Sequence, residues 1–297
     1  MEAATAGRAT TRDKVATKAK KGPKAQGPPW WIWLAVAGVV IFCLFPFYWL
    51  VNISLKTGPD LSSADLWPPN PSLENYKSIF QNSDFTRALA NSAIVALVTT
   101  FIGIVVGSFA AYALARLRMK FKFLLLGIVL SISTFPQIAI AAPLFRLWSD
   151  IGLYNTLIGL VIPYLTFALP LSIYILVSFF REIPKDLEEA ALVDGATNFQ
   201  AFIKVIVPLA APGLATTAIL TFIAAWNEFL LATTLTSSRA ARTVPVAISQ
   251  FTGSSQFEVP LGTQSAASVV VAVPLIVLVL LFQKRIVAGL TAGAVKG

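Results

Sequence analysis

The side chains that carry chemistry are few in this chain, and their types exclude several classes of site. The 297 residues include no histidine and one cysteine, Cys43. A zinc or haem site that needs imidazole, a Ser-His-Asp triad and an internal disulfide are therefore excluded. The chain also lacks the Gly-x-x-x-x-Gly-Lys-Ser/Thr phosphate loop. We predict no metal, no cofactor and no enzymatic activity of its own.

One carboxylate, Glu228, lies inside a long apolar stretch, directly after Trp226 and Asn227. An ionisable group at membrane depth is costly and indicates a functional site by default. Its hydrogen-bond acceptors and the aromatic neighbour are groups that a binding site for a polar ligand uses. We therefore name Trp226, Asn227 and Glu228 as substrate-path candidates, and Gln137 as another of the same kind. The alternative is that Glu228 locks its helix to a neighbouring helix.

Composition indicates that these residues lie in a membrane. Of the chain, 56% is hydrophobic and 12% is charged, whereas soluble domains carry about 25% charged residues. A helix needs about 20 apolar residues to cross the hydrocarbon core. Segments of roughly that length are residues 31–52, 91–115, 123–147, 155–180, 209–235 and 266–283. We predict an all-α integral membrane protein with six transmembrane helices.

Small residues within the segments predict a packed bundle. The prolines fit two interpretations, kinked helices that line a pathway or the ordinary frequency of proline in membrane helices. Gly103, Gly107, Ala111 and Ala115 recur every four residues, which lets another helix approach closely. Most segments also contain a proline, which frees a backbone carbonyl that a neighbour or a water-filled path must satisfy. The prolines are Pro46, Pro136, Pro163, Pro170 and Pro274.

The net charge of +9 is a topology signal rather than a sign of nucleic-acid binding. With the N-terminus inside, the inner segments hold 17 Lys and Arg residues and the outer segments hold 6. This asymmetry predicts that both termini are cytoplasmic. Residues 1–29 hold seven of the basic residues, and we predict that they form a disordered cytoplasmic tail that also contacts membrane lipid.

The segment 181–208 is too long for a simple connection, which usually takes 2–8 residues. Acids follow Pro184, where a helix dipole favours them, and Gly195 supplies a left-handed end to the helix. Thr197 and Gln200 then fit a capping box. We predict a short helix, a glycine turn and a second helix. Its alanine face favours docking on another protein over lying on the membrane surface.

The same segment resembles the EAA loop of binding-protein-dependent ABC importer permeases. The matching residues are Glu189, Ala190, Ala191, Asp194, Gly195, Ala196, Val205, Val207 and Pro208. Further motifs resemble the MalG-like permeases of carbohydrate importers, and the resemblance covers residues 30–297. They are Trp67-Pro68, Leu73–Tyr76, Asn91-Ser92, Ala225–Phe229 and the ending Gly289–Gly297. The run Phe251–Glu258 resembles the trehalose-importing branch, with a maltose-like sugar as the alternative.

This resemblance implies a type I ABC importer permease with the MetI-like fold, in the bacterial plasma membrane. The chain would form half of the pathway for a di- or oligosaccharide, beside a homologous MalF-like subunit. Glu189, Ala190, Ala191, Asp194 and Gly195 would couple it to an ATPase dimer that binds ATP and Mg²⁺. A sugar-binding protein or lipoprotein would deliver the cargo from outside.

Two other hypotheses stay open at this stage. A secondary transporter driven by an ion gradient would use intramembrane carboxylates or histidines, and the apolar segments contain Glu228 alone. A membrane scaffold without transport activity would have no need of prolines and an acid in its spans.

Overall fold

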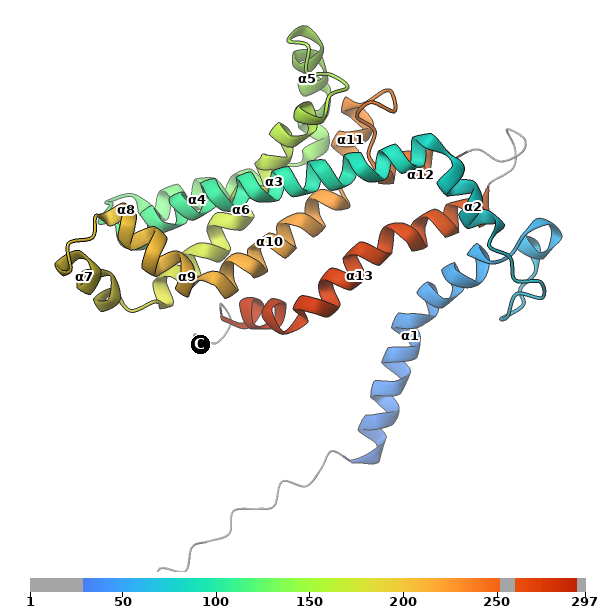
Figure 1. The fold of residues 1–297 in the computed structure, drawn as a ribbon, viewed down its shortest axis with the longest axis horizontal. Helices are drawn as coiled ribbons and strands as arrows, with labels where there is room; N and C mark the ends of the chain where they lie inside the picture. The colour runs from blue at the N-terminus through green and yellow to red at the C-terminus, as the bar shows by residue number, and fades with distance from the viewer. Residues whose placement is uncertain (1–28, 252–259, 293–297) are drawn as a thin grey trace, which may run out of the picture. The chain divides into compact units, whose positions relative to one another are not determined.

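The computed structural model describes residues 29–251 and 260–292, the latter with side chains as far as residue 283. Every regular element in these ranges is a helix (Figure 1). The longest are α1 (Trp30–Ser54), α3 (Ser83–Arg116), α6 (Leu157–Glu182) and α13 (Leu261–Ala292). The predicted basic tail, apart from Pro29, lies outside the described residues, as do residues 293–297 of the C-terminal motif.

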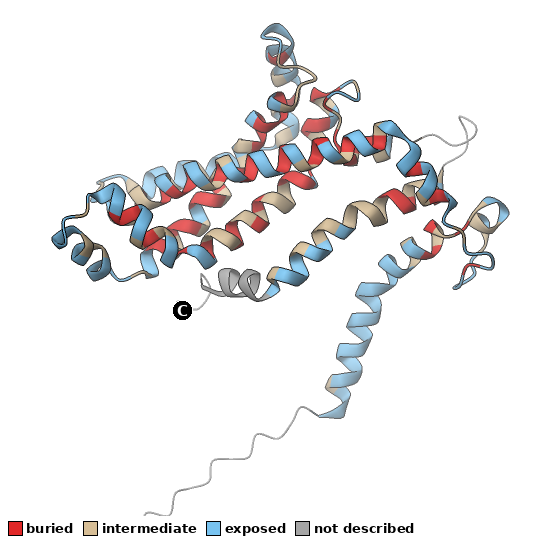
Figure 2. Ribbon diagram, in the orientation of Figure 1, coloured by how far each residue is buried: buried red, intermediate tan, exposed pale blue. Residues whose placement is uncertain are grey.

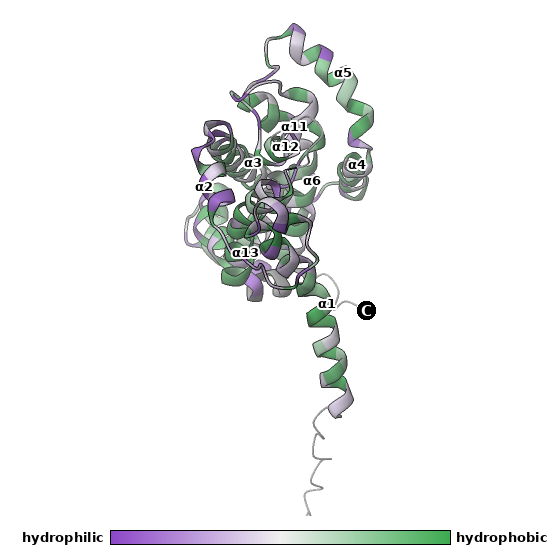
Figure 3. Cartoon of the chain, turned by 90° about the vertical axis from the view of Figure 1, so that its right-hand side faces the viewer, coloured by the Kyte–Doolittle hydropathy of each residue, from purple (hydrophilic) through white to green (hydrophobic). Residues whose placement is uncertain are grey.

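The chain forms two compact units, residues 1–46 and 47–297. In the first unit, residues 30–46 of α1 expose nearly every side chain (Figure 2). The sequence of this helix is apolar all round, and the side seen in Figure 3 is largely hydrophobic. A helix that is apolar all round is a membrane span or a core helix. The second unit contains the remaining helices and all the sites described below.

The helices are long and apolar enough to account for the predicted spans. Four of the described helices are each long and apolar enough to cross a membrane, namely α1, α3, α6 and residues 261–283 of α13. Two further pairs of helices meet the same criterion if each bent pair counts as one span. The fold is therefore that of a multi-pass all-α membrane protein with four to six spans.

The third predicted span, residues 123–147, is broken rather than continuous. Helix α4 (Lys122–Thr134) and helix α5 (Gln137–Asp150) meet at 83°. Phe135 and Pro136 between them are extended. Phe135 is extended because the residue before a proline avoids helical angles. The sequence marked the proline, but the size of the bend depends on how α5 packs against α11 (Leu230–Leu235).

The fifth predicted span, residues 209–235, is also divided. Helix α10 (Ala211–Trp226) ends before Asn227, and α11 begins after Phe229. At its other end α10 makes a 75° bend with the preceding helical segment, residues 198–209. The continuous helix at this position is therefore 16 residues long.

The core of the second unit lies between α3 and α6, where many of the residues are buried (Figure 2). A Cβ added at Gly107 would lie 2.8 Å from the Cβ of Ser172, and one at Gly103 would lie 3.5 Å from the Cβ of Ala168. The predicted stripe of small residues does allow a second helix to approach closely. It fixes α3 firmly against α6.

The remaining elements are short and lie at the two ends of this bundle. At one end are α2 (Glu74–Gln81), α12 (Val244–Ser249) and the 3-10 turn η1 (Gly58–Ser62). At the other are α7 (Lys185–Val193), α8 (Asn198–Ala201), the π-helix η2 (Phe202–Ile206) and α9 (Val207–Leu209) (Figure 1).

Candidate functional site

The carboxylate of Glu228 occupies the break between α10 and α11. Its Oε1 accepts a hydrogen bond from the Leu231 amide at 2.7 Å, and its Oε2 accepts one from the Ala232 amide at 3.0 Å. The Tyr164 hydroxyl on α6 donates to Oε2 at 2.6 Å. Glu228 therefore caps the first turn of α11 and ties it to α6, which favours the locking role that the sequence left open.

A cavity of about 580 Å³ opens beside this break. Gln137, Asn227 and Glu228 all line it, together with Phe167 from α6. Three of the four substrate-path candidates therefore meet at one surface, although Gln137 is 90 residues away in the chain. Glu228 is only 8% exposed and already accepts three hydrogen bonds, so the more accessible polar groups here are the Asn227 and Gln137 amides.

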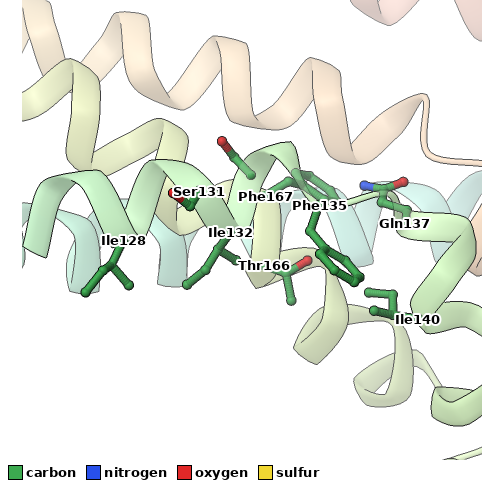
Figure 4. A pocket seen from close by; sticks show the side chains of 9 residues that line it. Ile128, Ser131, Ile132, Phe135, Gln137, Ile140, Thr166 and Phe167 are labelled. Carbon is green, nitrogen blue, oxygen red and sulfur yellow. The ribbon is translucent and has the colours of Figure 1, made fainter.

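A second cavity, of about 430 Å³, lies at the break between α4 and α5. Figure 4 shows Gln137 at the start of α5, with Phe167 of α6 facing the same space. These two residues also line the first cavity, so the two spaces adjoin along them. Ser131, Ser133 and Thr166 also line the second cavity, and their hydroxyls donate to carbonyls within their own helices. No sequence signal identified these three residues or Phe167.

Trp226, the fourth candidate, lies in the core instead of at either cavity. Its side chain is 4% exposed, and its ring stacks on Phe222 with centroids 5.5 Å apart. It belongs to the same packed cluster as Tyr164 and Leu231. Trp226 therefore packs in the buried core beside the break between α10 and α11.

The predicted helix, glycine turn and second helix of segment 181–208 are confirmed. Helix α7 ends at Val193 with Asp194 as its C-cap, and Gly195 has a φ of +89°, a conformation that favours glycine. Thr197 and Gln200 form both hydrogen bonds of the capping box that starts α8. Helix α7 has no buried residue, so Glu189 and Ala190 are exposed.

An aromatic cluster fixes the second half of this segment to the bundle. The Phe202 ring lies 4.6 Å from that of Tyr112, 5.3 Å from that of Phe109 and 6.1 Å from that of Phe180. Phe199 stacks on Phe109 at 6.3 Å. The exposed α7 therefore projects from a firmly packed base.

Polar motif residues at the opposite end hold loops in place. The Asn75 amide donates to the carbonyls of Ser54 and Lys56 at 2.9 and 2.8 Å. The Asn91 amide donates to carbonyls within residues 239–242, and the Ser92 hydroxyl accepts from the Val244 amide at 2.8 Å. Asn75, Asn91 and Ser92 therefore have a structural role, which is to hold neighbouring loop segments in place.

Comparison with known proteins identifies the family. Residues 103–291 match the family described as binding-protein-dependent transport system inner membrane component. The chain belongs to this family. Together with the relatives described next, this assignment confirms the predicted MalG-like permease of an ABC importer, and it disfavours the gradient-driven transporter and the scaffold.

Several relatives align along nearly their whole length. The trehalose transport system permease protein SugB of Mycobacterium tuberculosis is 55% identical, covering 87% of this chain and 94% of the relative. The trehalose/maltose transport system permease protein MalG of Thermococcus litoralis is 43% identical, over 87% and 94%. Most of the run Phe251–Glu258, which resembled the trehalose branch, lies outside the described residues.

A solved structure supports the fold. A chain of a bacterial ABC transporter involved in the import of the acidic polysaccharide alginate superposes with a TM-score of 0.69. It is 26% identical, and the match covers 85% of this chain and 96% of that one. The all-α permease fold is thereby confirmed, whereas the roles of the individual site residues stay predictions.

Proposed function

We propose that this chain is one of two permease subunits that form the sugar pathway of an ABC importer, with a trehalose-like disaccharide as cargo. The observation that carries the proposal is the 55% identity with SugB across 94% of that relative. The 43% identical MalG is also named for trehalose and maltose. A homologous MalF-like subunit would supply the other half of the pathway, and a sugar-binding protein would deliver the cargo.

The two adjoining cavities would form this subunit's share of the pathway. Asn227 and Gln137 offer amide groups that both donate and accept hydrogen bonds, which suits sugar hydroxyls. Phe167 lines both cavities and offers an aromatic ring to each. In this proposal Glu228 positions the break that presents Asn227, and Trp226 packs behind it.

The exposed α7 would dock on a separate ATPase subunit that binds ATP and Mg²⁺. Glu189, Ala190, Ala191, Asp194 and Gly195 are the proposed coupling residues. Among the described residues no group of three or more His, Cys, Asp or Glu side chains could hold a metal ion. In this proposal the partner subunit carries out the Mg²⁺-dependent ATP hydrolysis.

The proposed orientation places the α7 end and both termini in the cytoplasm and α12 on the outer side of a bacterial plasma membrane. Support comes from the 17 basic residues of the inner segments against 6 in the outer ones.

Uptake of labelled trehalose by the reconstituted complex tests the pathway. Asn227→Ala and Gln137→Ala should each raise KM about three- to tenfold, because each removes a neutral hydrogen-bonding group. Gln81→Ala, at the exposed last residue of α2, is the matched control and should leave KM unchanged. Wild-type KM in both cavity variants would contradict the assignment of the pathway.

Docking is tested in the same preparation. Glu189→Lys or Gly195→Pro should reduce uptake and binding-protein-stimulated ATP hydrolysis together, because each alters the surface that the ATPase contacts. Wild-type values of both activities in these variants would exclude α7 as the docking helix.

A further inference from the structure

Two side chains in the last turns of α3 hold α7 through a single carboxylate, Glu188. The Arg116 Nε lies 3.1 Å from Glu188 Oε2, and these side chains are 6% and 13% exposed. The Tyr112 hydroxyl donates a hydrogen bond to Glu188 Oε1. Arg116 also donates from Nη2 to the Ile183 carbonyl at 2.9 Å, just before α7. Because the pair is largely shielded from water, its attraction is less screened than that of a surface pair.

Helix α3 is built to move as one body. Of the four longest described helices it alone has no internal proline, and it runs for 34 residues. The close approach at Gly107 and Gly103 leaves no room for it to slide over α6 without displacing Ser172. A force on its last turn is therefore carried along its length.

The other half of α3 holds the segment between α11 and α12. The Asn91 amide donates to the carbonyls of Arg239, Ala240 and Arg242 at 3.2, 3.3 and 3.0 Å. Ser92 accepts from the first residue of α12. About 30 Å of helix separates Ser92 from Tyr112, at 1.5 Å per residue. Both ends of α3 thus make side-chain contacts with segments that lie at opposite ends of the bundle.

We propose that Glu188 is a positioning residue that passes the displacement of α7 to α3, and through α3 to residues 239–244 at the far end. This inference rests on the proposed function, because there α7 is the helix that the ATPase moves. The ion pair with Arg116 and the hydrogen bond from Tyr112 together restrain both the distance and the orientation of α7 relative to α3. Van der Waals contacts of an alanine side chain do not fix an orientation in this way. Glu188 acts through α3 and does not itself contact sugar or ATP.

Glu188→Gln tests the proposal by removing the charge while keeping the shape. The ATPase should still copurify, because Glu189, Asp194 and Gly195 are intact, but sugar uptake per ATP hydrolysed should fall roughly tenfold. The exchanged pair Glu188→Arg with Arg116→Glu should restore part of the ratio. Asp186→Asn, an exposed acid in the first turn of the same helix, is the matched control and should keep the wild-type ratio.

A wild-type ratio in Glu188→Gln would overturn the proposal. Loss of the ATPase from a folded Glu188→Gln permease would overturn it too, since Glu188 would then be a docking residue. Should Glu188→Gln not assemble for lack of folding, Tyr112→Phe removes one hydroxyl only, and a wild-type ratio there counts against the proposal.

Hydrogen exchange separates this proposal from the proposed function. ATPase binding to the wild-type permease should change amide exchange in residues 239–244, and Glu188→Gln should abolish that change. Binding without any such change in the wild type rejects the role of α3 alone. Failure of an ATPase to bind the wild-type permease rejects the proposed function.

Discussion

Glu188 and Glu228 are both shielded carboxylates that accept a hydrogen bond from a tyrosine, yet they are satisfied in different ways. Glu228 takes its other two hydrogen bonds from backbone amides three and four residues ahead. Glu188 instead forms an ion pair with Arg116, which lies 72 residues away on another helix. The difference separates a residue that builds a local break from one that links two separate helices.

Glu228 should therefore be the more important of the two for stability. Glu228→Ala leaves two buried amides and the Tyr164 hydroxyl without their acceptor, which should lower the free energy of unfolding by about 3 kcal/mol. The thermal unfolding midpoint of the purified complex measures this. Glu228→Gln keeps one carbonyl acceptor and should lie between wild type and Glu228→Ala. Equal midpoints for all three proteins would refute the capping role.

Paired tyrosine variants sharpen the comparison. Tyr164→Phe and Tyr112→Phe each remove one hydroxyl and should each lower stability by about 1 kcal/mol. Only Tyr112→Phe should also reduce sugar uptake per ATP hydrolysed, because only Glu188 joins α7 to α3. Unfolding midpoints and the uptake-to-hydrolysis ratio, measured on the same preparations, distinguish the two. Equal ratios in both variants would remove the functional difference between the two carboxylates.

A third carboxylate, Asp84, gives the smallest expected effect. Its ion pair with Arg239, at 3.4 Å, has side chains 43% and 58% exposed, Asp84 and Arg239 respectively. Asp84→Asn should change stability by at most about 0.5 kcal/mol, because solvent and salt screen an exposed pair. The change in stability caused by Asp84→Asn should disappear in high salt. The lower sugar uptake per ATP hydrolysed in Glu188→Gln should persist there. A loss of stability in Asp84→Asn that persists in high salt would show that solvent exposure does not determine the strength of these ion pairs.

Local signals in the sequence predicted the structure of segment 181–208 well. Gly195 and the pair of Thr197 and Gln200 define turns through contacts within a few residues, and the structure confirms both. The four-residue spacing of Gly103 and Gly107 likewise indicated a close helix contact, because spacing on a helix fixes a face.

Features that depend on helix rotation were not predictable. Gln137 and Asn227 meet at one cavity because α5 turns back toward α11, and no local pattern encodes that angle. Trp226 was expected at the pathway, but one position along a helix turns a side chain by about 100°, here into the core. Arg116 and Glu188 are paired by the packing of α3 against α6, so neither residue alone signalled the other.

The anchoring of α3 at both ends also constrains how this gene can change. An insertion of one residue between Ser92 and Tyr112 would rotate one end against the other by about 100° and lengthen the helix by about 1.5 Å. Either Asn91 or Arg116 would then face away from its partner. Homologues should therefore vary in loop length while keeping the number of residues between these two anchors constant.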